Sequence, residues 1–356
     1  MSKNRKFRAW PNCWLITGDR GSKTLKASDI SRADGWRVLK QSGPLLNFHL
    51  PMLLTSLICA IAASGAHALG VQPGQIKHLV TFGDSYTDVV ATGDQGTAWP
   101  VYAAGYSKTA LHPFARSGAT CNNNITFRPF PPVFGDQLPL YLMEASNGTL
   151  NLPPAETIYT LWIGTNDLGV DSLITGSNNA SVVDVTGCMI DWVRTLYASG
   201  ARNFIMQNLT ILYSANSYPN RFWAVERNTS DWSVLMNEMV LAGNKLTELM
   251  LKAAVPTLPG AHIALFDSHS LIQDIYDHPA LYLNGTAPLN VTGCWDSCVA
   301  PFGGGNLVCT VQNGTARDSY LWADELHPSE QADRIVAREI ALTLEGKTSR
   351  WSTWLS

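Results

Sequence analysis

The sequence lacks the short motifs that identify most cofactor-dependent and metal-dependent enzymes. It has no H-E-x-x-H zinc motif, no P-loop and no G-x-G-x-x-G dinucleotide fingerprint. It also has no internal repeat, no low-complexity tract and no linker that would divide the chain after residue 68. We therefore expect no cofactor and no metal, and we expect residues 69–356 to form one domain.

Positive charge is scarce beyond the first 51 residues. Residues 1–51 carry ten Lys and Arg against three Asp, whereas the remainder carries fifteen basic and twenty-five acidic residues. Such an acidic body is a poor partner for nucleic acid, whose phosphates it would repel. Because 46% of the residues are hydrophobic, the chain can bury a large core.

A comfortable membrane span is also missing, because the apolar run over residues 52–68 is shorter than the roughly 20 residues that a bilayer requires. It ends in Ala66-His67-Ala68, a small-x-small pattern typical of signal-peptide cleavage. We expect a cleaved signal at 52–68 and a secreted extracellular protein without stable membrane association. We expect residues 1–51 to be a basic extension. If translation starts at Met52, this extension is a gene-model artefact. An uncleaved signal would instead anchor the same domain in the membrane.

Glycosylation sequons favour the secretory route independently. Eight Asn residues begin an N-x-S/T pattern, and all follow the expected cleavage point. One of them lies in an apolar run typical of a strand, so some sequons should be unused. The eight candidates are Asn124, Asn147, Asn179, Asn208, Asn228, Asn284, Asn290 and Asn313.

Five cysteines follow residue 68, and most should form disulfides in an oxidising compartment, which leaves one over. Cys294 and Cys309 enclose a glycine-rich loop and are the expected local pair, with Cys294–Cys298 as the alternative. A zinc site is the weaker interpretation, because no histidine stands at ligand spacing near this cluster.

Short apolar runs alternate with helical patterns along the chain, which predicts a parallel sheet covered on both faces. The expected strands lie at 79–82, 111–114, 157–163, 203–212 and 262–266. The expected helices begin at Trp99, over 182–198, over 231–255 and, after a cap at Ser329, over 329–344. Residues 277–320 lack either pattern and are predicted to be irregular.

The stretch HLVTFGDSYTD over 78–88 is the centre of the functional prediction. It is a buried strand that breaks at Gly83 and delivers Ser85, and the carboxyl end of a strand is where ligands collect in an open α/β sheet. Taken alone, a serine in a turn is usually a helix cap. Two later stretches, GTND over 164–167 and DELHP over 324–328, make a nucleophile the better hypothesis.

Hydrolysis through serine requires a base, a carboxylate that orients the base and donors for the oxyanion. His327 follows Asp324 by three residues, so that one turn could bring both side chains together. Asn166 follows a strand and could donate its side-chain amide, although an Asx turn is the commoner role there. Gly118 allows a close backbone approach to a ligand.

These four blocks together resemble the GDSL or SGNH hydrolases, which are named for a Ser, Gly, Asn and His in this order: GDSY, SGAT, GTND and DELHP here. The resemblance implies a flavodoxin-like three-layer α/β/α sandwich with a five-stranded parallel sheet. It implies Ser85 as nucleophile, His327 as base, Asp324 as its orienter, and an oxyanion hole formed by the Ser85 and Gly118 amides and Asn166. Tyr86 departs from the family's usual leucine.

Several features of the chain together resemble fungal acetylesterases of carbohydrate esterase family 16. They are the expected secretion, the sequons, Trp99-Pro100, GATC and WADELHP. This resemblance implies an acetylesterase acting on hemicellulose-derived, acetylated oligosaccharides or another small ester. The alternatives are a secreted lipase or phospholipase and a non-catalytic carbohydrate-binding protein on the same scaffold. Four tryptophans could stack on a sugar, although core packing is their commoner role: Trp99, Trp162, Trp295 and Trp322.

Overall fold

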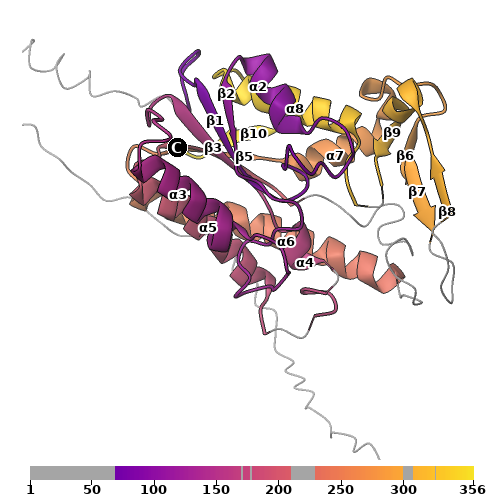
Figure 1. Cartoon of the computed structure of the whole chain (residues 1–356), viewed down its shortest axis with the longest axis horizontal. Helices are drawn as coiled ribbons and strands as arrows, with labels where there is room; N and C mark the ends of the chain where they lie inside the picture. Colours follow the sequence, from indigo (N-terminus) through magenta and orange to yellow (C-terminus); the bar gives the residue numbers. More distant parts are fainter. Residues whose placement is uncertain (1–68, 170, 177–178, 210–228, 300–307, 325) are drawn as a thin grey trace, which may run out of the picture. The chain divides into compact units, whose positions relative to one another are not determined.

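The computed structural model describes residues 69–169, 171–176, 179–209, 229–299, 308–324 and 326–356. At its centre these ranges form a sheet of six strands in the order β10-β5-β4-β3-β1-β2 (Figure 1). The first five strands along the chain run parallel, and β10 pairs antiparallel with β5 at the edge. The strands are β1 (His78–Gly83), β2 (Ala110–Pro113), β3 (Thr157–Trp162), β4 (Asn203–Gln207), β5 (His262–Phe266) and β10 (Ser352–Trp354).

The order 2-1-3-4-5 of the parallel strands is that of flavodoxin-like sheets, in which ligands bind where the strand order reverses. That point lies between β1 and β3, so the segments after Gly83 and Trp162 meet there. The predicted α/β class and the five parallel strands are confirmed. The antiparallel sixth strand, only three residues long, was not predicted.

Helices cover both faces of the sheet (Figure 1). Alternate residues of β1 divide between the faces: Leu79 packs with α2, α7 and α8, whereas Val80 and Phe82 pack with α3 and α5. This alternation produces two apolar layers around one sheet. The helices are α2 (Trp99–Ser107), α3 (Leu138–Ser146), α4 (Thr165–Leu168), α5 (Val182–Ala198), α6 (Thr229–Ala254), α7 (Ser268–Asp277) and α8 (Glu330–Leu344).

Local signals explain where several helices begin. A reciprocal capping box between Ser181 and Asp184 opens α5, and the Ser329 hydroxyl accepts a hydrogen bond from the Ala332 amide at the start of α8. The predicted helix at 182–198 matches α5, and Ser329 is the cap that was expected. No helix in the described ranges is both long enough and apolar enough to span a bilayer.

The segment that was predicted to be irregular contains two small ladders. The parallel pair is β6 (Asn290–Cys294) with β9 (Tyr320–Trp322), and the antiparallel pair is β7 (Asp296–Val299) with β8 (Val308–Val311). Two short helical turns lie in the same segment, η4 (Pro279–Leu281) and η5 (Gly314–Ser319). Two others lie earlier in the chain, η1 (Val133–Gln137) and η3 (Val255–Thr257).

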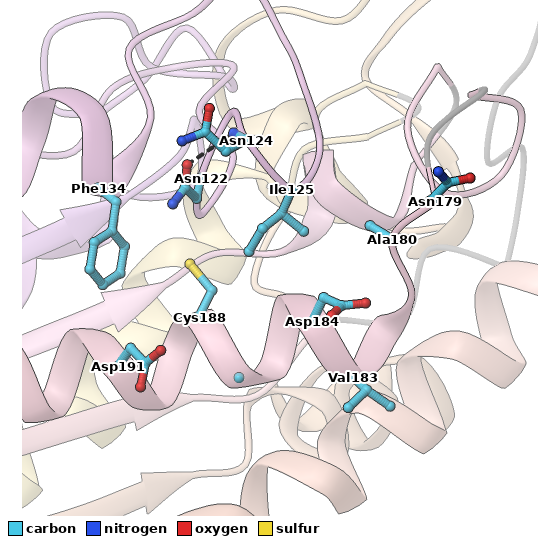
Figure 2. A pocket seen from close by; sticks show the side chains of 11 residues that line it. Asn122, Asn124, Ile125, Phe134, Asn179, Ala180, Val183, Asp184, Cys188 and Asp191 are labelled. Atoms are coloured by element: carbon cyan, nitrogen blue, oxygen red, sulfur yellow. Dashed lines mark hydrogen bonds between the residues drawn. The ribbon is translucent and has the colours of Figure 1, made fainter.

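A cleft of about 670 Å³ opens beside the amino-terminal half of α5 (Figure 2). Its wall is polar and includes Asn122, Asp184 and Asp191, together with two sequon residues, Asn124 and Asn179. None of the predicted catalytic residues lines it. The cleft is therefore separate from the reacting groups described below.

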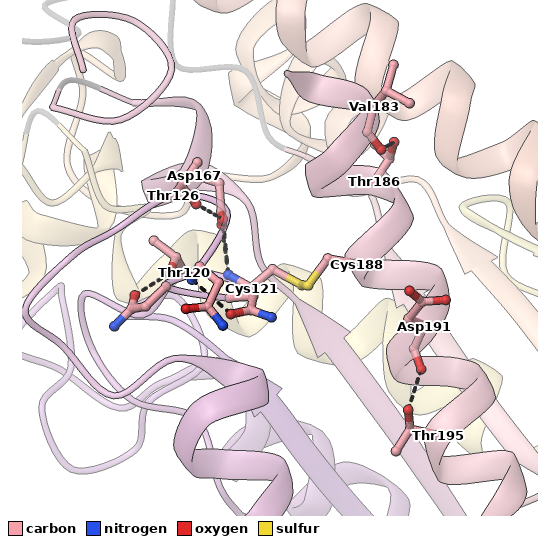
Figure 3. Close-up of a disulfide and its surroundings, with 12 residues drawn as sticks. Thr120, Cys121, Thr126, Asp167, Val183, Thr186, Cys188, Asp191 and Thr195 are labelled. Carbon is pink, nitrogen blue, oxygen red and sulfur yellow. Dashed lines mark hydrogen bonds between the residues drawn. A yellow bond between two sulfur atoms is a disulfide. The ribbon is translucent and has the colours of Figure 1, made fainter. Parts of the chain in front are cut away.

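A disulfide joins Cys121 to Cys188 of α5 across 67 residues (Figure 3). The Cys121 amide also donates to both carboxylate oxygens of Asp167, at 3.1 Å each. The bond therefore fastens the segment after Gly118 to the helix layer. Spacing could not predict this pair, because the partners lie on different elements.

The predicted Cys294–Cys309 pairing is wrong. Cys309 is disulfide-bonded, and it lies opposite Cys298 in the β7–β8 register. Cys294 belongs to the other ladder, retains its thiol and donates its Sγ–H to the carbonyl of Asp296 at 3.8 Å. The strands place Cys294 on the β6–β9 ladder and Cys309 on the β7–β8 ladder, a separation that the glycine-rich loop between them concealed.

Candidate active site

Ser85 lies in a tight turn directly after β1. The Thr87 and Asp88 amides both donate to the carbonyl of Asp84 at 2.9 Å, so the chain reverses within one helical turn and holds Ser85 at the carboxyl end of the strand. Only 8% of Ser85 is exposed. The Ser85 side chain is therefore largely enclosed by the protein.

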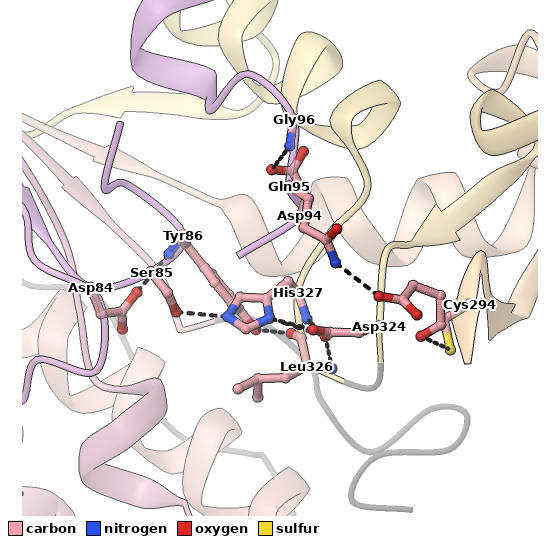
Figure 4. A network of polar contacts seen from close by, with 11 residues as sticks. Asp84, Ser85, Tyr86, Asp94, Gln95, Gly96, Cys294, Asp324, Leu326 and His327 are labelled. Carbon is pink, nitrogen blue, oxygen red and sulfur yellow. Dashed lines mark hydrogen bonds and ion pairs between the residues drawn. The ribbon is translucent and has the colours of Figure 1, made fainter. Parts of the chain in front are cut away.

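Three side chains meet in a continuous hydrogen-bonded line (Figure 4). Ser85 Oγ lies 2.8 Å from His327 Nε2, and His327 Nδ1 lies 3.0 Å and 2.9 Å from the two carboxylate oxygens of Asp324. The structure thus brings Ser85 together with His327, 242 residues further along the chain, and with Asp324 three residues before that histidine.

The loop that carries His327 is held by its own backbone and by Tyr86. The Leu326 and His327 amides both donate to Asp324 Oδ1 at 2.7 Å. The Tyr86 hydroxyl donates to the Leu326 carbonyl at 2.6 Å, and its ring meets the His327 ring edge-on at 5.8 Å. Tyr86, the departure from the family's leucine, therefore supports the histidine loop.

The electrostatics of the His327–Asp324 pair favour its ionised form. Burial opposes a charged imidazole, but the adjacent Asp324 carboxylate outweighs it and raises the pKa of His327 above its ordinary value. Burial likewise opposes the Asp324 charge, and His327 with the two backbone donors holds the pKa of that carboxyl below its usual range. Asp324 therefore remains an acceptor that fixes the imidazole orientation.

The predicted oxyanion donors lie on neighbouring segments. Asn166 is on α4, directly after β3, and its Nδ2 donates one hydrogen bond to the Ala119 carbonyl at 2.9 Å, next to Gly118. An amide carries a second Nδ2–H that can serve a ligand. Within the described ranges, neither the Ser85 nor the Gly118 amide donates a hydrogen bond to the protein.

Gly118 has a φ of +78°, a conformation that favours glycine. It is also covered by a ring: a methyl group at Gly118 would lie 2.5 Å from Cγ of Phe130. Phe130 remains 45% exposed, so one side of its ring packs on the glycine and the other faces solvent. Sequence reasoning missed Phe130, because nothing in its local pattern distinguishes it from Phe127.

Two buried carboxyls lie behind the reacting groups. Burial raises the pKa of Asp84 to about 7, against a single opposing donor, the Tyr86 amide at 3.1 Å. Burial also raises the pKa of Asp167 to about 6, although the Thr126 hydroxyl and the Cys121 amide donate to it. Sequence reasoning missed both, since burial is not readable from a residue's type.

Other sequence candidates fall outside this cluster. All four tryptophans considered for sugar stacking are core residues, with 4% exposure or less. Five sequon residues are exposed, Asn290 is half-buried, and Asn208 is buried with its amide donating to Asp267 Oδ1 at 3.1 Å. Asn228 lies outside the described residues. The exposed five are Asn124, Asn147, Asn179, Asn284 and Asn313.

Comparison with known proteins agrees with this geometry. The family model of the GDSL-like lipases and acylhydrolases matches residues 79–340. The chain belongs to this family. An acetylesterase of Hypocrea jecorina is 31% identical over 350 residues, covering 83% of this chain and 96% of the relative. An acetylesterase of Thermothelomyces thermophilus is 23% identical over 329 residues, covering 82% and 98%.

A comparison with solved structures also matches an acetylxylan esterase of Geobacillus stearothermophilus, with a TM-score of 0.35 and 12% identity over 79% of this chain and 98% of that one. The family and its acetylesterase members establish the reaction class. This protein is a carboxylic ester hydrolase of the GDSL/SGNH type.

Proposed function

We propose that this esterase is a secreted acetylesterase that removes O-acetyl groups from hemicellulose-derived carbohydrates. The observation that carries the chemistry is the line from Ser85 Oγ through His327 to Asp324, with contacts of 2.8 to 3.0 Å. The similarity to a fungal acetylesterase along 96% of that relative supports acetyl as the acyl group.

In the acylation step, His327 Nε2 takes the Ser85 proton while Oγ attacks the acetyl carbonyl carbon. The Asp324 carboxylate accepts the Nδ1–H bond and stabilises the imidazolium that forms. The negative charge moves to the carbonyl oxygen, where the Ser85 and Gly118 amides and the Asn166 side chain would donate to it. When the carbon–oxygen bond to the sugar breaks, the proton on Nε2 passes to the sugar oxygen.

The second half-reaction regenerates the enzyme. Water loses a proton to His327 Nε2 and attacks the acetyl-Ser85 carbonyl, and the same donors hold the second oxyanion. Collapse of that intermediate returns the proton to Ser85 Oγ and releases acetate. No step requires a metal, so we expect a chelator to leave turnover unchanged.

The test compares wild type with Ser85→Ala on para-nitrophenyl esters from acetate to palmitate and on acetylated xylo-oligosaccharides. We expect preference for acetate, release of acetate from the sugar, and loss of both in the variant. Ser117→Ala is a matched control, because within the described residues Ser117 hydrogen-bonds through its backbone amide, to Asp88 Oδ2 at 2.8 Å, which the substitution retains.

Two other results would replace this proposal. Preference for long acyl chains, with Ser85 still required, would identify a lipase or phospholipase. Absence of Ser85-dependent turnover together with retained binding of the oligosaccharides by both proteins would identify a carbohydrate-binding protein on an esterase scaffold.

Secretion is supported by the exposed sequons and by the Cys121–Cys188 disulfide, since disulfides persist in oxidising compartments. We expect the protein in the culture medium, beginning near residue 69, with a mass that falls on enzymatic removal of N-glycans. Asn208 should be unmodified, because its buried amide cannot accept a glycan in the folded protein. A cell-bound protein that keeps residues 52–68 would indicate the membrane anchor instead.

A further inference from the structure

A glycine in the loop before α2 lies directly against the ring of His327. A methyl group at Gly93 would stand 2.0 Å from Cδ2, 2.4 Å from Cγ and 2.6 Å from Nε2 of His327. Contacts below 3.0 Å essentially never occur for real Cβ atoms, so no larger residue fits unless something moves. The backbone of Gly93 therefore occupies the space beside the nitrogen that faces Ser85.

The imidazole cannot move aside without loss of its hydrogen bonds. It is fixed at Nε2 by Ser85 and at Nδ1 by Asp324, and the Tyr86 ring meets it edge-on. A displaced ring would break the 2.8 Å contact to the serine hydroxyl. A misplacement of about 1 Å in a reacting group can lower a rate about 100-fold.

Backbone conformation does not account for the glycine. Gly93 is absent from the residues with positive φ, so an alanine could adopt its backbone angles without strain. The steric conflict with His327 is thus the reason for glycine on this side of the loop. Gly118 differs, because there the positive φ of +78° would favour glycine even without the contact with Phe130.

The loop is tied to the same strand that holds the histidine segment. Gln95 Nε2 donates to Asp296 Oδ2 at 2.9 Å, and the Asp296 amide donates to the carbonyl of Ala323 at 2.8 Å, one residue before Asp324. Asp296 is 6% exposed. One buried residue of β7 therefore sets the separation between the Gly93 loop and the Asp324–His327 turn.

We propose that Gly93 is a positioning residue that holds the His327 ring against Ser85, with Gln95 and Asp296 fixing the distance. The loop closes the side of the imidazole that Asp324 and Tyr86 leave open. Since the imidazole exchanges protons with Ser85 and with the leaving group through Nε2, a fixed ring serves both transfers. This inference rests on the proposed function of Ser85 and His327 and assigns a role to a residue that reacts with nothing.

The experiment measures kcat and KM of Gly93→Ala on para-nitrophenyl acetate beside wild type. We expect kcat to fall by about 10- to 100-fold while KM and Tm stay near wild type. Gly105→Ala is the matched control, because it adds the same methyl group within α2, where nothing lies within 4 Å. It should leave both constants unchanged.

A double variant separates positioning from contact with the substrate. In a His327→Ala background there is no ring to displace, so adding Gly93→Ala should not lower the residual rate further. A raised KM with unchanged kcat, or an equal loss in both backgrounds, would show that Gly93 contacts the substrate or supports the fold, and would overturn the proposal.

If Gly93→Ala does not fold, Gln95→Asn decides. Asn tolerates the φ of +55° at this position but is too short to reach Asp296. A lower kcat that disappears in the His327→Ala background supports the proposal, and an unchanged kcat refutes it. Wild type without Ser85-dependent turnover would refute the proposed function, whereas an active wild type with a fully active Gly93→Ala would refute this inference alone.

Discussion

Asp84 should make the stability of this protein fall as pH rises from about 4 to 8. The carboxyl is 1% exposed, its Oδ1 accepts only the Tyr86 amide within the described ranges, and its Oδ2 has no hydrogen-bond partner there. Burial raises its pKa from 3.8 to about 7. The folded state therefore holds this proton more tightly than the unfolded state does.

The sign and size follow from that difference. Below pH 3.8 both states are protonated and Asp84 costs nothing; as pH rises through 3.8 to about 7, the unfolded chain ionises first and stability is lost. A difference of about three pH units corresponds to roughly 4 kcal/mol at pH 8. Asp84→Asn imitates the protonated carboxyl at every pH, so it should remove this loss.

The assay is urea unfolding of wild type and Asp84→Asn at several pH values between 4 and 8. We expect the variant to gain about 4 kcal/mol relative to wild type across this range, with little of the gain at pH 4. Asp191→Asn is the control, since its side chain is 59% exposed. A stability difference between wild type and Asp84→Asn that does not change with pH would refute the reasoning.

Three further perturbations follow from the site and the disulfide. Asp324→Asn removes the carboxylate that raises the pKa of His327, so kcat should fall by about 10⁴-fold and the acid limb of kcat/KM should move to lower pH; an unmoved limb would contradict the pairing. In wild type that limb should lie above pH 6.5, because the neutral base is lost on protonation. Phe130→Ala should raise KM for acetylated xylo-oligosaccharides several-fold with kcat retained, and an unchanged KM would remove Phe130 from the binding surface. Replacing Cys121 and Cys188 by serine should lower the free energy of unfolding by about 4 kcal/mol, as urea titration would measure; a loss under about 1 kcal/mol would show that the 67-residue loop is ordered without the bond.

The central sheet was predictable because its strands are continuous apolar runs bounded by glycine and proline. The prediction at 262–266 coincides with β5, and the one at 203–212 begins with β4 but extends past its end at Gln207; residues 210–212 lie outside the described residues. Helix α7 was missed, because it begins directly after β5 and only Leu271, Ile272 and Ile275 mark its apolar face. Its cap, Asp267, accepting from the Ser270 amide, was the available signal.

The candidate catalytic residues could be selected from the sequence because the chemistry expected of them depends on residue type and on order along the chain. Ser85 and Asn166 follow β1 and β3, and the parallel pairing of these strands brings their carboxyl ends together. His327 instead follows β9 of the small β6–β9 ladder, so only its D-x-x-H-P block, and not the central sheet, predicted it. The Cys121–Cys188 disulfide was not predictable, because it depends on the contact between a loop and helix α5, which leaves no pattern along the sequence.

Gly93 and Asp84 show a different limit. In the sequence, Gly93 is one of several glycines in a polar loop, and Asp84 is one acid beside a serine. The role we infer for Gly93 comes from a ring 234 positions away, and the role of Asp84 comes from its burial. Neither residue takes part in the proposed reaction, yet each acts on His327. The backbone of Gly93 restricts the position of the His327 ring, and ionised Asp84 helps to raise the pKa of His327. Substituting either residue should therefore alter the rate or pH dependence of Ser85 without altering its chemistry, and only measurements that separate rate, binding and stability can tell such residues from ordinary parts of the fold.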